Sequence, residues 1–95
     1  MSGETVARRL IMSGRVQGVG FRAFVKFHAD KLGLDGFVRN RSDGSVEALI
    51  AGDIQKVDAL IALCHEGPPA SRVNDVQVSE DSRHLEKGFA HLPTI

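Results

Sequence analysis

The sequence of 95 residues contains a single cysteine and neither tyrosine nor tryptophan. One cysteine cannot close a disulfide within the chain, and it excludes a metal site built on several thiolates. Cys64 falls on an apolar stripe with the spacing of a helix face, so we expect a packed thiol rather than a nucleophile. The missing tyrosine and tryptophan argue against an RNA-binding sheet, which stacks bases on exposed aromatic rings.

Long apolar runs and an excess of either charge are also missing. Twelve basic residues balance twelve acidic ones, which argues against a nucleic-acid binder with a broad basic face. No apolar run approaches the roughly 18 residues of a membrane helix, and residues 1–5 lack the apolar centre of a signal peptide. We therefore expect one soluble, cytoplasmic domain over residues 1–95, a monomer without membrane or nucleic-acid partners.

The chain does contain a stretch suited to binding an anion, from Gly14 to Arg22. An apolar run leads into it, it holds three glycines, and an amphipathic helical pattern follows directly. Glycines let successive backbone N–H groups converge, and a helix N-terminus adds unpaired donors and roughly half a positive charge. Arg22, in the first helical turn, adds a planar guanidinium that matches phosphate oxygens.

This glycine-rich stretch does not match a nucleotide-binding loop. Its spacing differs from G-x-G-x-x-G, and no lysine followed by serine or threonine is present. Glycines between a strand and a helix can also serve only to turn the chain. An arginine in a first helical turn opposes the helix dipole, however, which favours an anionic partner for Arg22. The sequence therefore predicts a site for a small anion.

Hydrophobic periodicity and turn residues predict the order βαββαβ, with a possible short fifth strand. The expected strands span residues 6–13, 37–41, 46–51 and 72–79, and Pro93 confines the last, 89–92, to a sheet edge. One helix is expected over 21–32 and the next between its N-cap Asp53 and Gly67. The buried helix faces are expected to contain Phe21, Phe24, Val25, His28, Ala29 and Leu32, and Ile54, Val57, Leu60, Ile61 and Cys64.

This order indicates an α+β fold, a ferredoxin-like βαββαβ sandwich with both helices on one face of an antiparallel sheet. The first two strands run parallel with the third between them, so both end at the same rim. Two strand spacings separate their backbones by roughly 10 Å. The glycine loop with Arg22 and the strand end at Asn40 are therefore expected to face each other across that rim.

The residues gathered there limit the chemistry. Asn40 can orient a water without gaining or losing a proton, and we find no general base, nucleophile or metal-ligand cluster beside it. A site that only positions and stabilises suffices when the leaving group is a carboxylate, with a pKa of about 4. The sequence thus favours a mixed carboxylic–phosphoric anhydride as substrate, and it implies no metal and no cofactor.

Several of these residues also have ordinary structural interpretations. Asn40 beside a turn can be a turn former, and Arg15, Arg39 and Arg41 can be charges at the rim that steer an anion at most. His28 is expected to lie at the edge of the core. His65 is expected near the rim, where it could donate a proton. His84 and His91 show no metal-binding spacing.

Taken together, two motifs resemble the signatures of the acylphosphatase family. Residues 14–22, Gly-Arg-Val-Gln-Gly-Val-Gly-Phe-Arg, resemble its first signature. Residues 36–40, Gly-Phe-Val-Arg-Asn, followed by Gly44-Ser45-Val46 and Gly52, resemble its second signature at the expected spacing. Leu32-Gly33-Leu34 and the segment 67–70 are similar as well, so the resemblance covers nearly the whole chain. The tail 90–93 departs from the family pattern.

The resemblance implies a small ferredoxin-like hydrolase that splits small acyl phosphates into a carboxylate and inorganic phosphate without a metal. Arg22 would hold the phosphate and Asn40 would position the attacking water. The backbone amides that would help to bind the phosphate belong to Arg15, Val16, Gln17, Gly18, Val19 and Gly20. Two alternatives remain: a counterpart of the acylphosphatase-like domain of hydrogenase-maturation carbamoyl transferases, which would prefer carbamoyl phosphate, and a non-enzymatic binding module.

Overall fold

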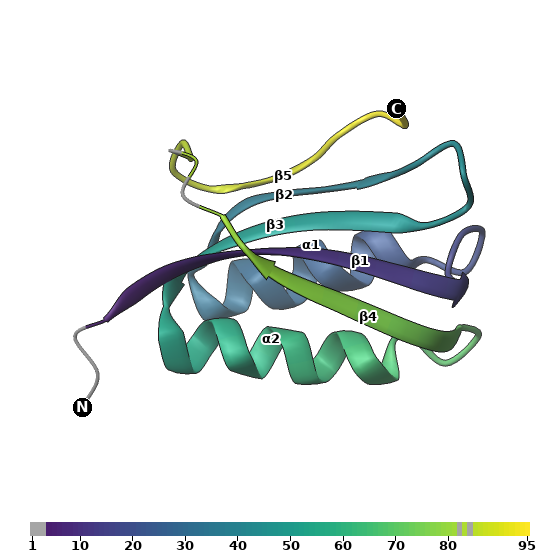
Figure 1. The fold of residues 1–95 in the computed structure, drawn as a ribbon, viewed down its shortest axis with the longest axis horizontal. Coiled ribbons are helices and arrows are strands. Elements are labelled where there is room, and N and C mark those ends of the chain that lie inside the picture. Colours follow the sequence, from purple (N-terminus) through teal and green to yellow (C-terminus); the bar gives the residue numbers. More distant parts are fainter. Residues whose placement is uncertain (1–3, 82, 84) are drawn as a thin grey trace.

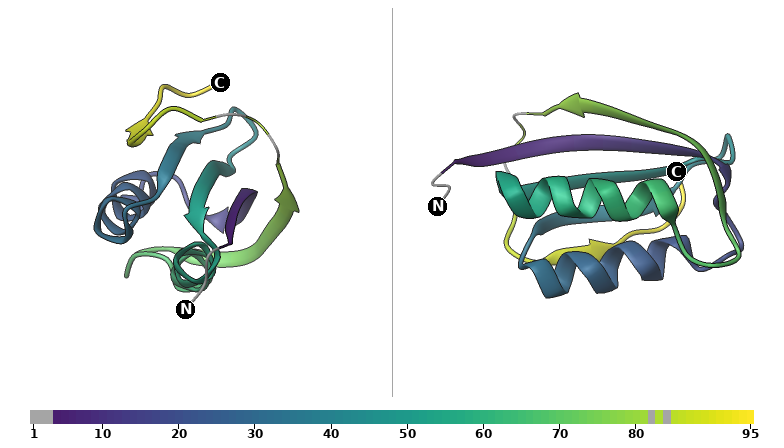
Figure 2. Two further views of the ribbon diagram at one scale, coloured as in Figure 1. Left: turned by 90° about the vertical axis from the view of Figure 1, so that its left-hand side faces the viewer. Right: turned by 90° about the horizontal axis from the view of Figure 1, so that it is seen from below.

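The computed structural model describes residues 4–81, 83 and 85–95 as two helices on one five-stranded sheet (Figure 1). The elements are β1 (Thr5–Arg15), α1 (Phe21–Leu32), β2 (Asp35–Asn40), β3 (Val46–Asp53), α2 (Ile54–Glu66), β4 (Arg72–Glu80) and β5 (Phe89–His91). Figure 2 shows both helices on the same side, with the sheet curving around them. The predicted ferredoxin-like α+β fold is confirmed.

The strand order β4-β1-β3-β2-β5 gives the sheet the predicted arrangement at its centre. β3 lies between β1 and β2 and pairs antiparallel with both, so β1 and β2 run parallel. Their ends, Arg15 and Asn40, therefore share one rim, and Figure 1 shows the C-terminus of α2 at the same end. Strand bounds differ from the prediction by up to two residues. β1, β3 and β4 are longer because backbone pairing continues beyond the apolar pattern, whereas β2 and β5 each end one residue earlier than predicted.

The predicted short fifth strand is present at a sheet edge, and the structure supplies its pairing, which the sequence left open. β5 pairs in parallel with β2, Gly36 opposite Phe89 and Val38 opposite His91. The sheet is therefore mixed, and the expected antiparallel pairing holds only among its first four strands. Backbone bonds extend this pairing, since Leu92 N donates to Val38 O (2.9 Å) and Ile95 N donates to Asn40 O (3.1 Å).

The core lies between the sheet and the two helices. Strand alternation sends Leu10 and Met12 toward the helices, where both are fully buried. The predicted stripe of α1 is buried or half-buried, and α2 contributes Val57, Leu60 and Cys64. Burial raises the pKa of the Cys64 thiol to about 12, which agrees with the expected packed thiol. Within the described residues, neither helix is long and apolar enough to cross a membrane.

Candidate active site

The connection between β1 and α1 forms a loop whose backbone needs glycine. Gly18 has φ 75° and Gly20 has φ 81°, in the left-handed region that other residues avoid. Gly20 is also the N-cap of α1, and it provides no side-chain cap. The first turn of α1 contains no acidic residue, so its N–H groups and dipole remain available to an anion.

The loop, the start of α1 and the end of β2 enclose one small pocket. Its volume is about 130 Å³, and its lining residues are Val16, Gly18, Gly20, Phe21, Arg22, Ala23, Asn40 and His91. The two residues predicted to act together, Arg22 and Asn40, thus meet in the same cavity. Pockets for drug-sized ligands begin near 300 Å³, so this cavity suits a small group.

Arg22 and Asn40 are both half-buried. Among the described residues, no hydrogen bond or ion pair engages the guanidinium of Arg22 or the carboxamide of Asn40. The backbone of Asn40 is held in place, however, because its carbonyl accepts a hydrogen bond from Ile95 N (3.1 Å). A side chain whose backbone is held in place and whose polar atoms have no protein partner is suited to bind a ligand.

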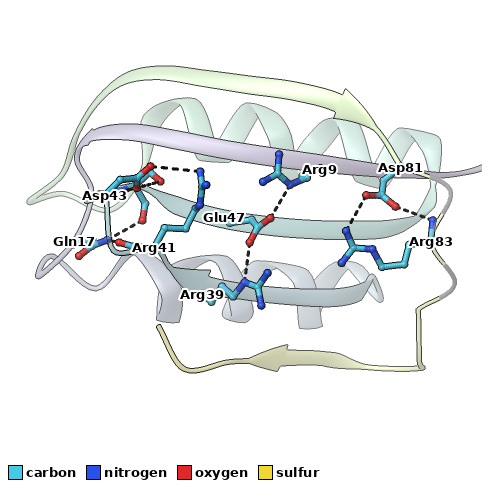
Figure 3. A network of polar contacts seen from close by, with 9 residues as sticks. Arg9, Gln17, Arg39, Arg41, Asp43, Glu47, Asp81 and Arg83 are labelled. Carbon is cyan, nitrogen blue, oxygen red and sulfur yellow. Dashed lines mark hydrogen bonds and ion pairs between the residues drawn. The ribbon is translucent and has the colours of Figure 1, made fainter. Parts of the chain in front are cut away.

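Gln17 ties the loop to the hairpin that follows Asn40. Its Nε2 donates to Arg41 O and to Ser45 O, each at 2.8 Å (Figure 3). These bonds link the two halves of the pocket across the rim. Arg15, Gln17 and Val19 are not among the lining residues, so of the six loop residues predicted to bind phosphate, Val16, Gly18 and Gly20 border the cavity.

The hairpin itself is ordered by Asp43. Its Oδ1 accepts hydrogen bonds from Ser45 N (2.9 Å) and Ser45 Oγ (2.6 Å), and these bonds lower the pKa of the Asp43 carboxyl. Arg41 Nη1 lies 3.6 Å from Asp43 Oδ2. Arg41 therefore pairs within the predicted turn and does not line the pocket.

Arg39 is placed differently from the prediction. It lies on the sheet face opposite the helices, where Nε donates to Glu47 Oε1 at 2.8 Å while Arg9 Nε donates to Glu47 Oε2 at 2.7 Å (Figure 3). Burial alone would raise the pKa of Glu47, but the hydrogen bonds from Arg39 and Arg9 outweigh it and lower that pKa. Arg39 is therefore part of a structural network rather than a rim charge.

One histidine that the sequence did not assign to the site lines the pocket, and one suggested as a proton donor does not. His91 lines the pocket, whereas His65, expected near the rim, does not. His28 packs against Phe24 with ring centroids 4.6 Å apart, as expected at the core edge, and His84 lies outside the described residues. Sequence reasoning missed His91 because its position depends on the parallel pairing of β5. The available signal was the two-residue spacing of Phe89 and His91, which places both side chains on the same face of the last strand.

The donor set of this pocket can stabilise negative charge and orient a water. Backbone N–H groups and Arg22 can bind a phosphate, while the Asn40 carboxamide can both donate and accept a hydrogen bond. Among the described residues, no group of three or more histidine, cysteine, aspartate or glutamate side chains could hold a metal ion. The pocket therefore supplies positioning and electrostatic stabilisation.

Comparisons with known proteins point to one family. The sequence profile of the family described as Acylphosphatase matches residues 8–91. The chain is 48% identical over 92 residues to an acylphosphatase of Rhizorhabdus wittichii, covering 97% of this chain and 93% of that one. It also resembles the crystal structure of an acylphosphatase from Bacillus subtilis, with a TM-score of 0.87, 40% identity, and coverage of 92% and 98% of the two chains.

A similar fold also occurs within a much longer protein. The structure of full-length HypF in a phosphate- and nucleotide-bound form matches with a TM-score of 0.88 and 33% identity. That match covers 96% of this chain but 12% of HypF. The two-helix, five-strand arrangement is therefore found both as a separate protein and as a small part of a larger one.

Proposed function

The chain belongs to the acylphosphatase family and is an enzyme that hydrolyses acyl phosphates, and we propose that the reaction takes place in the pocket between the glycine loop, Arg22 and Asn40. The observation that carries this proposal is that Arg22 and Asn40 line one small cavity while neither side chain has a protein partner among the described residues. An arginine and a carboxamide left free beside a helix N-terminus form a site for an anion and a water.

The phosphate group binds to the loop and to Arg22. Amides of residues 15–20 and the first N–H groups of α1 contact its oxygens, and the guanidinium of Arg22 makes charge-assisted hydrogen bonds to them. These donors are fixed before the substrate arrives, because the loop backbone is set by Gly18 and Gly20. They stabilise the charge that develops on the phosphoryl group during the reaction.

Asn40 positions the attacking water. Its carboxamide oxygen accepts a hydrogen bond from the water and directs the water oxygen toward phosphorus. The bond from phosphorus to the bridging oxygen breaks, and the carboxylate leaves with the electron pair. Because a carboxylate is stable near neutral pH, the leaving group needs no proton and the water proton passes to solvent or to the phosphate product.

Hydrolysis of benzoyl phosphate by wild type and by variants of the two residues tests this assignment. We expect inorganic phosphate to inhibit competitively, because it occupies the same donors as the substrate. A chelator such as EDTA is expected to leave the rate unchanged, since the pocket donors alone perform the chemistry. A rate that falls with the chelator and returns with a divalent cation would contradict the proposed mechanism.

Carbamoyl phosphate is the alternative substrate. We include carbamoyl phosphate because the chain is similar to a small part of HypF, a much longer protein. Turnover of carbamoyl phosphate and acetyl phosphate by the same preparation separates the two. We expect both to be hydrolysed, with no strong preference for the carbamoyl compound, because the pocket has room for little beyond the phosphate group.

We further propose that residues 1–95 act as one monomeric, cytoplasmic domain without nucleic-acid partners. The monomer is supported by the exposed large apolar residues, Phe27, Val78 and Ile95, which lie on three different segments. Sedimentation at micromolar concentration tests the monomer, and cell fractionation tests the location. Salt-sensitive binding to single-stranded RNA would contradict the absence of a nucleic-acid partner.

A further inference from the structure

β5 contributes one residue, His91, to the lining of the pocket. Strand alternation puts it on the same face of β5 as Phe89, which is buried against the core. The pocket that contains Arg22 and Asn40 is bordered by His91 as well. Its imidazole is the one titratable side chain, apart from the guanidinium of Arg22, among the described lining residues.

The backbone around His91 is fixed while its side chain is open to solvent. His91 sits opposite Val38 in the parallel pairing of β5 and β2, and the next residue, Leu92, donates its N–H to Val38 O at 2.9 Å. The residue itself is exposed. A histidine held by its backbone in the lining of a pocket can gain or lose a proton and still reach a ligand.

The charged groups around His91 are cationic or already paired. On α1, Arg22 shares the pocket, and Lys26 donates to Phe89 O (3.1 Å) and pairs with Asp30 (2.8 Å). On β2, Val38 and Asn40 carry no charge, and the described lining residues of the loop are apolar. Among the residues that the structure describes, no carboxylate lines the pocket. A dianion bound in the pocket would therefore meet cationic groups and no competing carboxylate among these residues.

We propose that His91, when its imidazole is protonated, is a second cationic residue that binds the dianionic phosphate group of substrate and product. This inference rests on the proposed function. Arg22 alone supplies one positive charge for a group that carries two negative charges. Protonated His91 supplies the other from β5, a different element that lines the same cavity. The carboxylate leaving group needs no proton, so His91 acts in binding rather than as a general acid.

This role predicts a pH dependence of binding. Histidine is the residue type whose ordinary pKa, about 6.5, falls between pH 5.5 and pH 8, so this range tests whether a charged imidazole contributes to binding. A hydrogen bond to a charged group contributes enough for about a tenfold change in affinity. We therefore expect the KM for an acyl phosphate to rise about tenfold between these two pH values.

The experiment measures KM for benzoyl phosphate and the inhibition constant of sulfate from pH 5.5 to 8. Sulfate keeps both charges throughout this range, so its binding reports on the protein alone. His91→Gln is expected to raise both constants about tenfold at pH 5.5 and to remove their pH dependence, with a larger effect on KM than on kcat. His91→Lys, which stays charged, is expected to keep both constants low up to pH 8.

His65→Gln is the matched control, because His65 is an exposed histidine on α2 that does not line the pocket. It is expected to keep the wild-type profile. Identical pH dependence in wild type and His91→Gln would overturn the inference, as would a loss confined to kcat. An NMR titration of wild type provides a second measurement, in which sulfate is expected to raise the pKa of the His91 imidazole. An unchanged His91 pKa would also overturn it.

Failure of this inference can be distinguished from failure of the proposed function. If the pocket is not the active site, Arg22→Ala retains benzoyl phosphate hydrolysis and sulfate inhibition. If only the role of His91 is wrong, Arg22→Ala loses both while His91→Gln keeps the wild-type pH profile.

Discussion

Two groups of arginines in this molecule have opposite environments. On the open face of the sheet, Arg9 and Arg39 both bind the buried carboxylate of Glu47, whose side chain is 4% exposed. At the rim, Arg22 lies in the first turn of a helix, in a pocket that no carboxylate lines. The same residue type thus stabilises the fold in one place and is left for a ligand in the other.

The difference shows how a functional arginine can be recognised. Arg9 and Arg39 have their acidic partner within the protein, and the carboxylate of that partner is buried. Arg22 has no acidic partner among the described residues and faces backbone donors that also favour an anion. The partner missing from the protein is therefore expected to be the substrate. Substitutions on the two sides should separate activity from stability.

The largest effect is expected for Arg22→Ala. Loss of the guanidinium removes charge stabilisation from the phosphoryl group, so turnover of benzoyl phosphate should fall on the order of 100-fold or more. Thermal unfolding should change little, because no protein partner is lost. Arg39→Ala is the matched control, with an unfolding midpoint expected to fall and turnover expected to stay near wild type. Unchanged turnover in Arg22→Ala together with a large loss of turnover in Arg39→Ala would contradict the distinction between the two arginine groups.

Asn40→Ala is expected to reduce turnover by about 100-fold as well, with KM less affected, because the variant still binds phosphate but no longer orients the water. Asn40→Asp sharpens this test at nearly constant shape. Its added negative charge repels the phosphate group, so KM should rise in addition. Steady-state kinetics of the three proteins measure both effects, and wild-type turnover by Asn40→Ala would exclude the water-positioning role.

Glu47→Gln should act on stability and spare turnover. The buried network loses its charge, and since Arg9 and Arg39 remain partly solvated, we expect a loss of about 1–2 kcal/mol in the free energy of unfolding. Because the pKa of Glu47 is lowered in the folded protein, its stabilisation is complete above the ordinary value of about 4.3 and is lost as the pH falls below it. Denaturant unfolding at pH 7 and pH 3 should therefore show a larger difference between variant and wild type at pH 7 than at pH 3.

Gln17→Ala is expected to have the smallest effect. It removes the two bonds that link the loop to the carbonyls of Arg41 and Ser45, so the halves of the pocket lose a positioning contact. We expect turnover to fall by less than tenfold, on the basis that the loop backbone is retained. Gln55→Ala, on the exposed start of α2, is the control. A loss as large as that of Arg22→Ala would mean that Gln17 contacts the substrate.

Much of the fold could be predicted because its signals are local. The apolar spacing of α1, its end at Gly33, the N-cap Asp53 and the turn at Asp43 are all read within a few residues, and each is found in the structure. The meeting of Arg22 and Asn40 was also predictable, since it follows from the strand order once βαββαβ is recognised.

The rest depends on contacts between residues distant in sequence. The parallel pairing of β5 involves three residues beyond a polar segment, and no local pattern states which edge such a strand joins. The place of His91 follows from that pairing and was missed with it. The Glu47 network was missed for the same reason, since Arg9 lies 38 residues from its partner.

The shortness of β5 also affects how the enzyme fails. A three-residue strand at a sheet edge can detach at a free-energy cost well below that of global unfolding. Detachment would carry His91 away from the pocket and release the bond from Ile95 to Asn40, while the central strands stay folded. Under mild denaturant, catalytic activity should then decline before the far-ultraviolet circular dichroism signal does. Protection of the Leu92 amide from hydrogen exchange should decline together with the activity.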